Sequence, residues 1–158
     1  MTMIIYKKRT RLKDFEYKGH HRYFLTLCTA HKKPIFDDGS IVEWLTNVLK
    51  DKSKHHGFKV WVYCFMPDHL HLLIEGTTSK SDMRMFVSDY KQLTGFLAKK
   101  KIKEPLWQIN YFDHVLRKEE DTLNVARYIL NNPVRRGLVD DYRDYKLLGS
   151  FEADIAEL

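Results

Sequence analysis

A short stretch near the middle of the chain, residues 65–76, constrains the fold more than any other part of the sequence. Its Pro67-Asp68 pair is typical of a tight turn, because proline fixes φ and aspartate bonds to nearby backbone. The apolar runs on either side therefore predict two antiparallel strands joined as a hairpin. Because side chains alternate along a strand, His69 and His71 are expected on one face and the leucines on the other.

Two imidazoles side by side on a rigid strand are suited to binding a divalent metal ion. The alternative is the polar face of a half-buried strand that happens to carry histidine twice, and spacing alone does not separate the two. A metal site at His69 and His71 therefore needs a further group from elsewhere in the chain.

The composition indicates a globular intracellular protein. Hydrophobic residues make up 44% of the 158 residues and aromatic residues 13%, which is enough for a core. Cys28 and Cys64 stand far apart in apolar runs, and we interpret both as buried thiols in a reducing cytoplasm. No apolar stretch has the length of a membrane span, and residues 1–9 lack the order of a signal peptide. We expect a cytoplasmic, nucleoid-associated protein with no membrane partner.

The charge of the chain favours a polyanionic partner. Lysine and arginine total 27 against 21 acidic residues, a net charge of +6. Residues 1–22 form a basic arm with interleaved aromatic residues, and its candidate contacts to DNA phosphates are Lys7, Lys8, Arg9 and Arg11. A solvated, flexible terminus is the alternative for this arm.

Periodicity and turn residues predict helices and strands around the hairpin. The expected elements are strands over 23–29 and 58–65, helices over 40–55 and 81–100, an extended segment at 105–117, and a helix from about 121 that ends before Pro133. Ser40 is expected to cap the first helix, and Tyr90 to lie in the buried stripe of the second. This order predicts an α+β fold, a ferredoxin-like sandwich whose antiparallel sheet has helices packed on one face. Residues 140–158 have weak signals and are expected to be peripheral.

The last of these helices carries a second candidate group. On a helical wheel its apolar residues share one broad arc, whereas Asn124, Tyr128 and Asn132 share the opposite side. The tyrosine thus lies on a polar face, with an amide one turn before it and another one turn after it. An ordinary amphipathic tyrosine at a helix surface is the alternative.

Three motifs follow one another along the chain. They are Met-Pro-Asp-His-Leu-His at 66–71, Leu-Trp-Gln at 106–108 with Phe-Asp-His at 112–114, and Ala-Arg-Tyr-Ile-Leu-Asn-Asn-Pro-Val-Arg-Arg-Gly-Leu-Val at 126–139. In this order they resemble the single-tyrosine HUH transposases, IS200-like proteins, and most closely the REP-associated tyrosine transposase branch. The resemblance covers residues 23–139, the expected catalytic core of a single domain spanning 1–158.

The resemblance implies a set of site residues and a chemistry. His69 and His71 match the pair that holds a divalent metal ion, Mg²⁺ or Mn²⁺, and Asn132 matches the polar residue that completes the metal site. Tyr128 matches the nucleophile. The implied activity is cleavage and rejoining of single-stranded DNA next to hairpin-forming, palindromic repeats through a covalent 5′-phosphotyrosine intermediate.

Several further residues are candidate DNA contacts. Trp107, Tyr111 and Phe112 are candidates for stacking on unpaired bases, although aromatic rings in such a segment more often belong to a core. Arg135 and Arg136 are candidates for binding the duplex of a hairpin. The resemblance leaves open whether the protein is a monomer or a homodimer.

Two other functions stay open at this point. One is a domesticated module that binds repeat DNA or RNA without cutting it. The other is a zinc-binding regulatory domain built on His69, His71 and Cys64.

Overall fold

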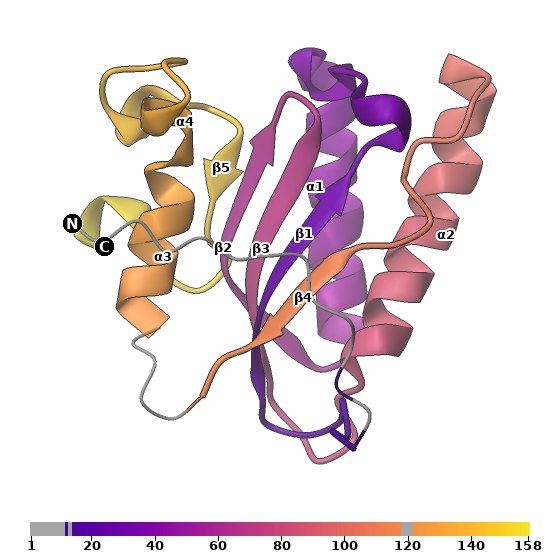
Figure 1. Ribbon diagram of the computed structural model, residues 1–158, viewed down its shortest axis with the longest axis vertical. Coiled ribbons are helices and arrows are strands. Elements are labelled where there is room, and N and C mark those ends of the chain that lie inside the picture. Colours follow the sequence, from indigo (N-terminus) through magenta and orange to yellow (C-terminus); the bar gives the residue numbers. More distant parts are fainter. Residues whose placement is uncertain (1–11, 13, 118–121) are drawn as a thin grey trace.

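The computed structural model describes residues 12, 14–117 and 122–158. Its main elements are β1 (Arg22–Cys28), α1 (Gly39–His55), β2 (Phe58–Met66), β3 (His69–Gly76), α2 (Met83–Ile102), β4 (Phe112–Val115), α3 (Thr122–Leu130), α4 (Asn132–Arg135) and β5 (Leu148–Gly149). An antiparallel sheet in the order β4-β1-β3-β2-β5 stands between two layers (Figure 1). Helices α1 and α2 cover one face and α3 covers the other. The predicted α+β sandwich is confirmed, but its helices do not all pack on one face as predicted, because α3 lies opposite α1 and α2.

The central strand β3 has two faces of different character. Leu70, Leu72 and Ile74 are buried in the core beneath α1 and α2. His71 points the other way and packs against Phe24, with 5.4 Å between ring centroids, in the layer beneath α3. The predicted hairpin and the alternation of its side chains are therefore present, and the histidine face is the one that α3 approaches.

A β-bulge in β2 decides which side chains reach that second face. The register with β3 shifts between Val60 and Val62, so Trp61 is the extra residue. Val60 packs beneath α1 and α2, whereas Val62 and Cys64 pack beneath α3. Since a one-residue shift reverses every later side chain, the bulge places Cys64 on the same face as its pairing partner His71.

Helix ends differ from the prediction in small ways. The carboxylate of Asp38 accepts the backbone N–H of Ser40 at 3.0 Å, so Asp38 and not Ser40 caps α1. An aspartate is as good a cap as a serine, and this one stands earlier in the chain. Helix α3 ends at Leu130, as expected, but the short helix α4 follows at once, since proline is accepted in a first turn. No helix of the described chain is long and apolar enough to cross a membrane.

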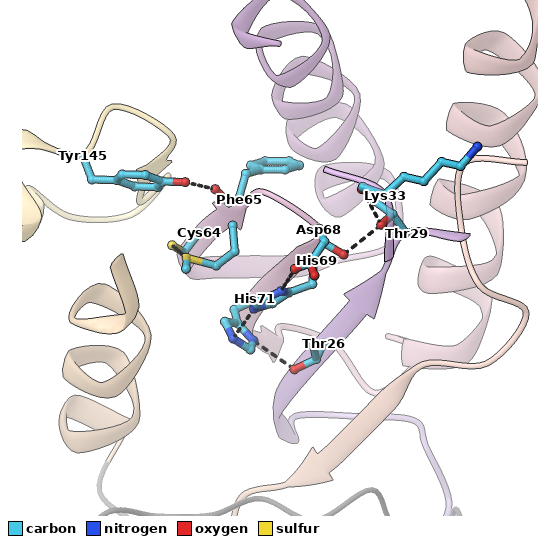
Figure 2. A network of polar contacts seen from close by, with 10 residues as sticks. Thr26, Thr29, Lys33, Cys64, Phe65, Asp68, His69, His71 and Tyr145 are labelled. Carbon is cyan, nitrogen blue, oxygen red and sulfur yellow. Dashed lines mark hydrogen bonds and ion pairs between the residues drawn. The ribbon is translucent and has the colours of Figure 1, made fainter. Parts of the chain in front are cut away.

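The segment 140–158, expected to be peripheral, adds a short edge strand to the sheet. Strand β5 pairs with β2, and Leu148 is buried beneath α3. The hydroxyl of Tyr145 donates to the backbone carbonyl of Phe65 at 2.5 Å (Figure 2). A strand of two residues has no periodicity, so local patterns did not predict it.

The core contains a hydroxyl without a partner among the described residues, that of Tyr23. Burial raises the pKa of this phenol, so it stays neutral. We expect Tyr23→Phe to raise the free energy of unfolding by about 1 kcal/mol, because an unsatisfied buried hydroxyl costs ~1–3 kcal/mol. Urea unfolding measures the change. Tyr90→Phe is the matched control, because the buried Tyr90 donates to the Leu45 carbonyl at 3.1 Å and its loss should destabilise. A destabilised Tyr23→Phe would contradict the expectation.

Candidate active site

A cavity of about 560 Å³ lies between the sheet, α3 and the segment that leads into β4. It is lined by Phe24, Thr26, Cys28, Lys32, Asp68, His69, His71, Gln108, Asn110, Tyr111, Phe112, Tyr128, Asn132 and Arg136. The cavity therefore brings together, within one chain, the two histidines, the tyrosine and the asparagine that the resemblance implies. Cys28 lines it as well and is only half-buried, so its expected full burial is wrong, whereas Cys64 is buried as expected.

The two histidines converge on one point in the cavity. Their Nε2 atoms are 3.1 Å apart, and their rings are inclined by 77°. Each ring is held from behind through its other nitrogen, His69 by Asp68 at 2.6 Å and His71 by the Thr26 hydroxyl at 2.9 Å (Figure 2). Thr26 stands opposite His71 in the β1–β3 pairing, so the sheet itself places this contact.

The outer contacts at Nδ1 decide whether the Nε2 atom that faces the cavity carries a proton or a lone pair. A carboxylate can only accept, so His69 carries its proton on Nδ1 and presents the lone pair of Nε2. The Thr26 hydroxyl can accept or donate, which lets His71 present either a proton or a lone pair toward His69. Burial is the main cause that lowers the pKa of both imidazoles, and Arg136 lowers both further. Both rings are therefore neutral, the state in which imidazole binds a metal ion.

This donor set fits a divalent cation. Two ligands at right angles around a cation with bonds of about 2.1 Å stand about 3 Å apart, close to the separation of the two Nε2 atoms. Among the described residues, no group of three or more His, Cys, Asp or Glu side chains is arranged to hold a metal. A third protein ligand must then be of another kind, and the buried amide of Asn132 lies in the same cavity.

The zinc alternative loses its third ligand. Cys64 is buried and is not among the described residues that line the cavity with His69 and His71. Its Sγ contacts the Met66 sulfur at 3.9 Å, within the apolar layer beneath α3. A hard cation with oxygen and imidazole ligands suits the cavity better than zinc.

Tyr128 is half-buried at the wall of the cavity. Its ring packs on Phe24 with 6.1 Å between centroids, and the guanidinium of Arg135 lies 4.0 Å from the ring centroid. Arg135 also donates to the backbone carbonyl of Tyr128 at 2.7 Å and reaches the Asn132 side chain at 3.5 Å. Arg135, predicted to bind a hairpin, thus joins the tyrosine to the asparagine one turn later.

Positive charge surrounds the histidines. Lys32 and Arg136 both line the cavity, and Arg136 was predicted as a DNA contact. Lys32 has a positive φ of 52°, which is unusual for lysine and places it at the cavity edge after β1. Cations at the mouth of a cavity suit a phosphate group.

The other predicted DNA contacts differ in whether the structure places them at the cavity. Trp107 is 7% exposed and its indole N–H donates to Thr94 at 2.9 Å, so it belongs to the core and the prediction that it stacks on a base is wrong. Its ring fills the space beside Phe36, as a large aromatic ring does in a core. Tyr111 and Phe112 do line the cavity. The arm residues Lys7, Lys8, Arg9 and Arg11 lie outside the described residues.

Thr26, Lys32 and Asp68 are site residues that the sequence reading missed. Only Asp68 had a signal, because it directly precedes His69. Thr26 reaches the site through the pairing of β1 with β3, and Lys32 lies in the turn after β1. Local periodicity predicts neither position.

We expect Thr26→Val to weaken Mn²⁺ binding by roughly 10- to 100-fold, the usual effect of removing the partner that orients a ligating histidine. Valine keeps the shape of threonine but offers nothing to His71 Nδ1. Isothermal titration of the purified protein with Mn²⁺ measures the affinity without any DNA. Thr26→Ser keeps the hydroxyl and should bind like the parent, whereas equal binding by Thr26→Val would show that the contact has no such role.

Residues 17–132 match the family model described as "Transposase IS200 like". The match spans most of the chain, so the chain belongs to the IS200-like transposase family, and the resemblance inferred from the motifs is confirmed. The family is one of transposases.

Individual relatives agree with this assignment. The chain is 27% identical to a Haemophilus influenzae protein provisionally named a REP-associated tyrosine transposase, over 84% of this chain and 81% of the relative. It is 28% identical to the ISDra2 transposase TnpA of Deinococcus radiodurans, over 68% of this chain and 80% of the relative. The solved structure of a REP-associated tyrosine transposase bound to a REP hairpin shares the fold, with a TM-score of 0.72 at 16% identity over 89% of this chain and 82% of that one.

Proposed function

We propose that this protein is a metal-dependent, single-stranded DNA endonuclease and strand transferase of the REP-associated type. The observation that carries the proposal is the single cavity that holds a phenol, two converging neutral imidazoles and a buried amide. These are the groups needed to attack a phosphodiester and to bind a cation beside it.

In the proposed reaction the oxygen of Tyr128 attacks phosphorus and gives up its proton. The bond from phosphorus to the 3′-oxygen breaks, and that oxygen takes a proton and leaves as a 3′-hydroxyl. The 5′-phosphate stays joined to Tyr128. Attack by a 3′-hydroxyl on this phosphotyrosine reverses the step, so rejoining needs no ATP.

The other residues of the cavity support this step. Lys32 and Arg136 would bind the oxygens of the phosphate, and Phe24 and Arg135 both contact the Tyr128 ring. A bound Mg²⁺ or Mn²⁺ at His69, His71 and Asn132 would neutralise charge on the phosphate and favour the phenolate.

The proposed partner is single-stranded DNA that carries a hairpin or palindromic repeat, met in the cytoplasm. The related protein of known structure was solved with a REP hairpin, and the basic charge of this chain suits the same class of partner. Because the tyrosine and the histidines line one cavity of one chain, we propose that a monomer is sufficient for cleavage.

Covalent capture tests the proposal. The protein is mixed with a hairpin oligonucleotide labelled at its 3′ end, with Mn²⁺ or with EDTA, and run on a denaturing gel. The 3′ label is required because the fragment joined to the protein is the one with the 5′-phosphate. We expect a labelled protein band only with the metal. Tight binding of the hairpin with no such band would overturn the proposal in favour of a module that binds repeats without cutting them.

A further inference from the structure

A second hollow, of about 470 Å³, runs along the outer face of α2. One wall is a single face of that helix, formed by Ser88, Lys91, Gln92, Gly95, Phe96 and Lys99. The other wall is the segment 105–111, which runs back beside α2 toward β4 (Figure 1). Gln108 and Tyr111 line both this hollow and the candidate active site. The hollow, here called the α2 groove, therefore adjoins the site across the segment 105–111.

The α2 groove exposes large apolar side chains to solvent. Phe96 is 65% exposed and Ile109 is 94% exposed, although side chains of this kind are usually at least half covered. The ammonium group of Lys100 lies 5.2 Å from the centre of the Phe96 ring. An open aromatic face next to lysine is the arrangement on which proteins stack unpaired bases.

The charge of the α2 groove suits a phosphate backbone. Lys91 and Lys99 line it, and none of the described lining residues is acidic. Lys91 also donates to the carbonyls of Gln108 at 2.7 Å and Ile109 at 3.0 Å, and lies 5.3 Å from the centre of the Tyr111 ring. It thereby fixes the wall that the groove shares with the active site.

Gly95 keeps the floor of the α2 groove open. A Cβ added there would meet the nearest atom, on Trp107, at 4.0 Å, an ordinary contact, so packing does not require glycine. Glycine inside a helix costs about 1 kcal/mol relative to alanine. The missing side chain instead leaves space between Phe96 and the segment 105–111.

We infer that the α2 groove binds the single strand that flanks the scissile phosphate, with one base stacked on Phe96 and the backbone near Lys99. The identity of this strand depends on the proposed function, because the groove adjoins the cavity in which the phosphate would react. The other observations concern the groove alone. They are an exposed aromatic ring, two lysines and no acidic residue among the described lining.

Binding to two DNAs tests the inference without any cleavage. Fluorescence anisotropy in EDTA, in a Tyr128→Phe background, compares a hairpin with single-stranded flanks and the same hairpin without them. We expect Phe96→Ala to bind the flanked DNA about tenfold more weakly, the usual size of one stacked base. Binding of the flankless hairpin should not change. Lys99→Glu should weaken binding to the flanked DNA and reduce its salt dependence.

Matched controls distinguish a specific role of the α2 groove in binding from a general effect of changing surface residues. Met85→Ala removes another apolar side chain of α2, 61% exposed but outside the groove, and Lys54→Glu reverses a charge on α1. Both should bind the two DNAs like the parent. Gly95→Gln fills the floor and improves helix propensity, and urea unfolding of this variant shows whether weaker binding occurs in a folded protein.

Two results would overturn the inference. The first is binding of flanked DNA by Phe96→Ala and Gly95→Gln that equals that of the parent. The second is self-association that these substitutions abolish, seen by sedimentation, while DNA binding is unchanged, which would assign the groove to a second copy of the chain. Failure of covalent capture by the wild-type protein would overturn the proposed function and leave these binding measurements intact.

Discussion

Tyr128→Phe is expected to abolish the covalent protein–DNA band while the variant binds hairpin DNA and Mn²⁺ like the wild-type protein. Phenylalanine keeps the ring that packs on Phe24 and beneath Arg135 but has no oxygen to attack phosphorus. Loss of a nucleophile lowers a rate by at least about 10⁴-fold, so the band should fall below detection. Denaturing gels measure the band, and anisotropy and calorimetry measure the two binding steps.

Tyr111→Phe is the matched control, because Tyr111 is the other tyrosine among the described residues that line the cavity. Its hydroxyl contacts the sulfur of Met83 at 3.8 Å, away from the histidine pair in the sheet. The control should form the covalent band at a rate within a few-fold of the wild type. A band that survives Tyr128→Phe and disappears in Tyr111→Phe would identify Tyr111 as the nucleophile and contradict the role proposed for Tyr128.

His71→Ala is expected to remove Mn²⁺ binding and to slow formation of the covalent band by about 10³-fold, and His69→Ala should act in the same way. The loss of a metal that stabilises charge on the phosphate is worth several kcal/mol, and each 1.4 kcal/mol is tenfold in rate. Calorimetry with Mn²⁺ and single-turnover capture measure the two effects. His55→Ala, at an exposed position on α1, should change neither.

The histidine and tyrosine variants must fail in different ways. Tyr128→Phe should keep the metal and lose the band, whereas the histidine variants should lose both. If the histidine variants bind Mn²⁺ with wild-type affinity, the cation is held elsewhere and the cavity needs another explanation.

Local sequence patterns predicted the parts of the site that depend on one element. Alternation after the Pro67-Asp68 turn predicted His69 and His71 on one face of β3. Helical spacing predicted Tyr128 and Asn132 on one side, although Asn132 begins α4 directly after the end of α3. These patterns depend only on the geometry of a single strand or helix, so the local sequence is enough to predict them. The hairpin, the long helices and the sandwich followed from the same signals.

Features that depend on pairing between distant segments were not predictable in this way. Thr26 meets His71 only because β1 pairs with β3 in one register, and the bulge at Trp61 alone turns Cys64 toward α3. Trp107 was a candidate both for the core and for stacking on a base, because an aromatic residue in an extended segment has the same pattern whether it faces a core or a solvent groove. Contacts with residues that are distant in the sequence bury Trp107 in the core.

Mass spectrometry of the captured complex tests the central claim most directly. Trypsin cuts after Arg127 and after Arg135, so Tyr128 lies in a short peptide of its own. After nuclease digestion, the account predicts that this peptide carries a nucleotide joined through its 5′-phosphate to the tyrosine. A nucleotide on any other peptide, or a captured complex in which this peptide is unmodified, would contradict it.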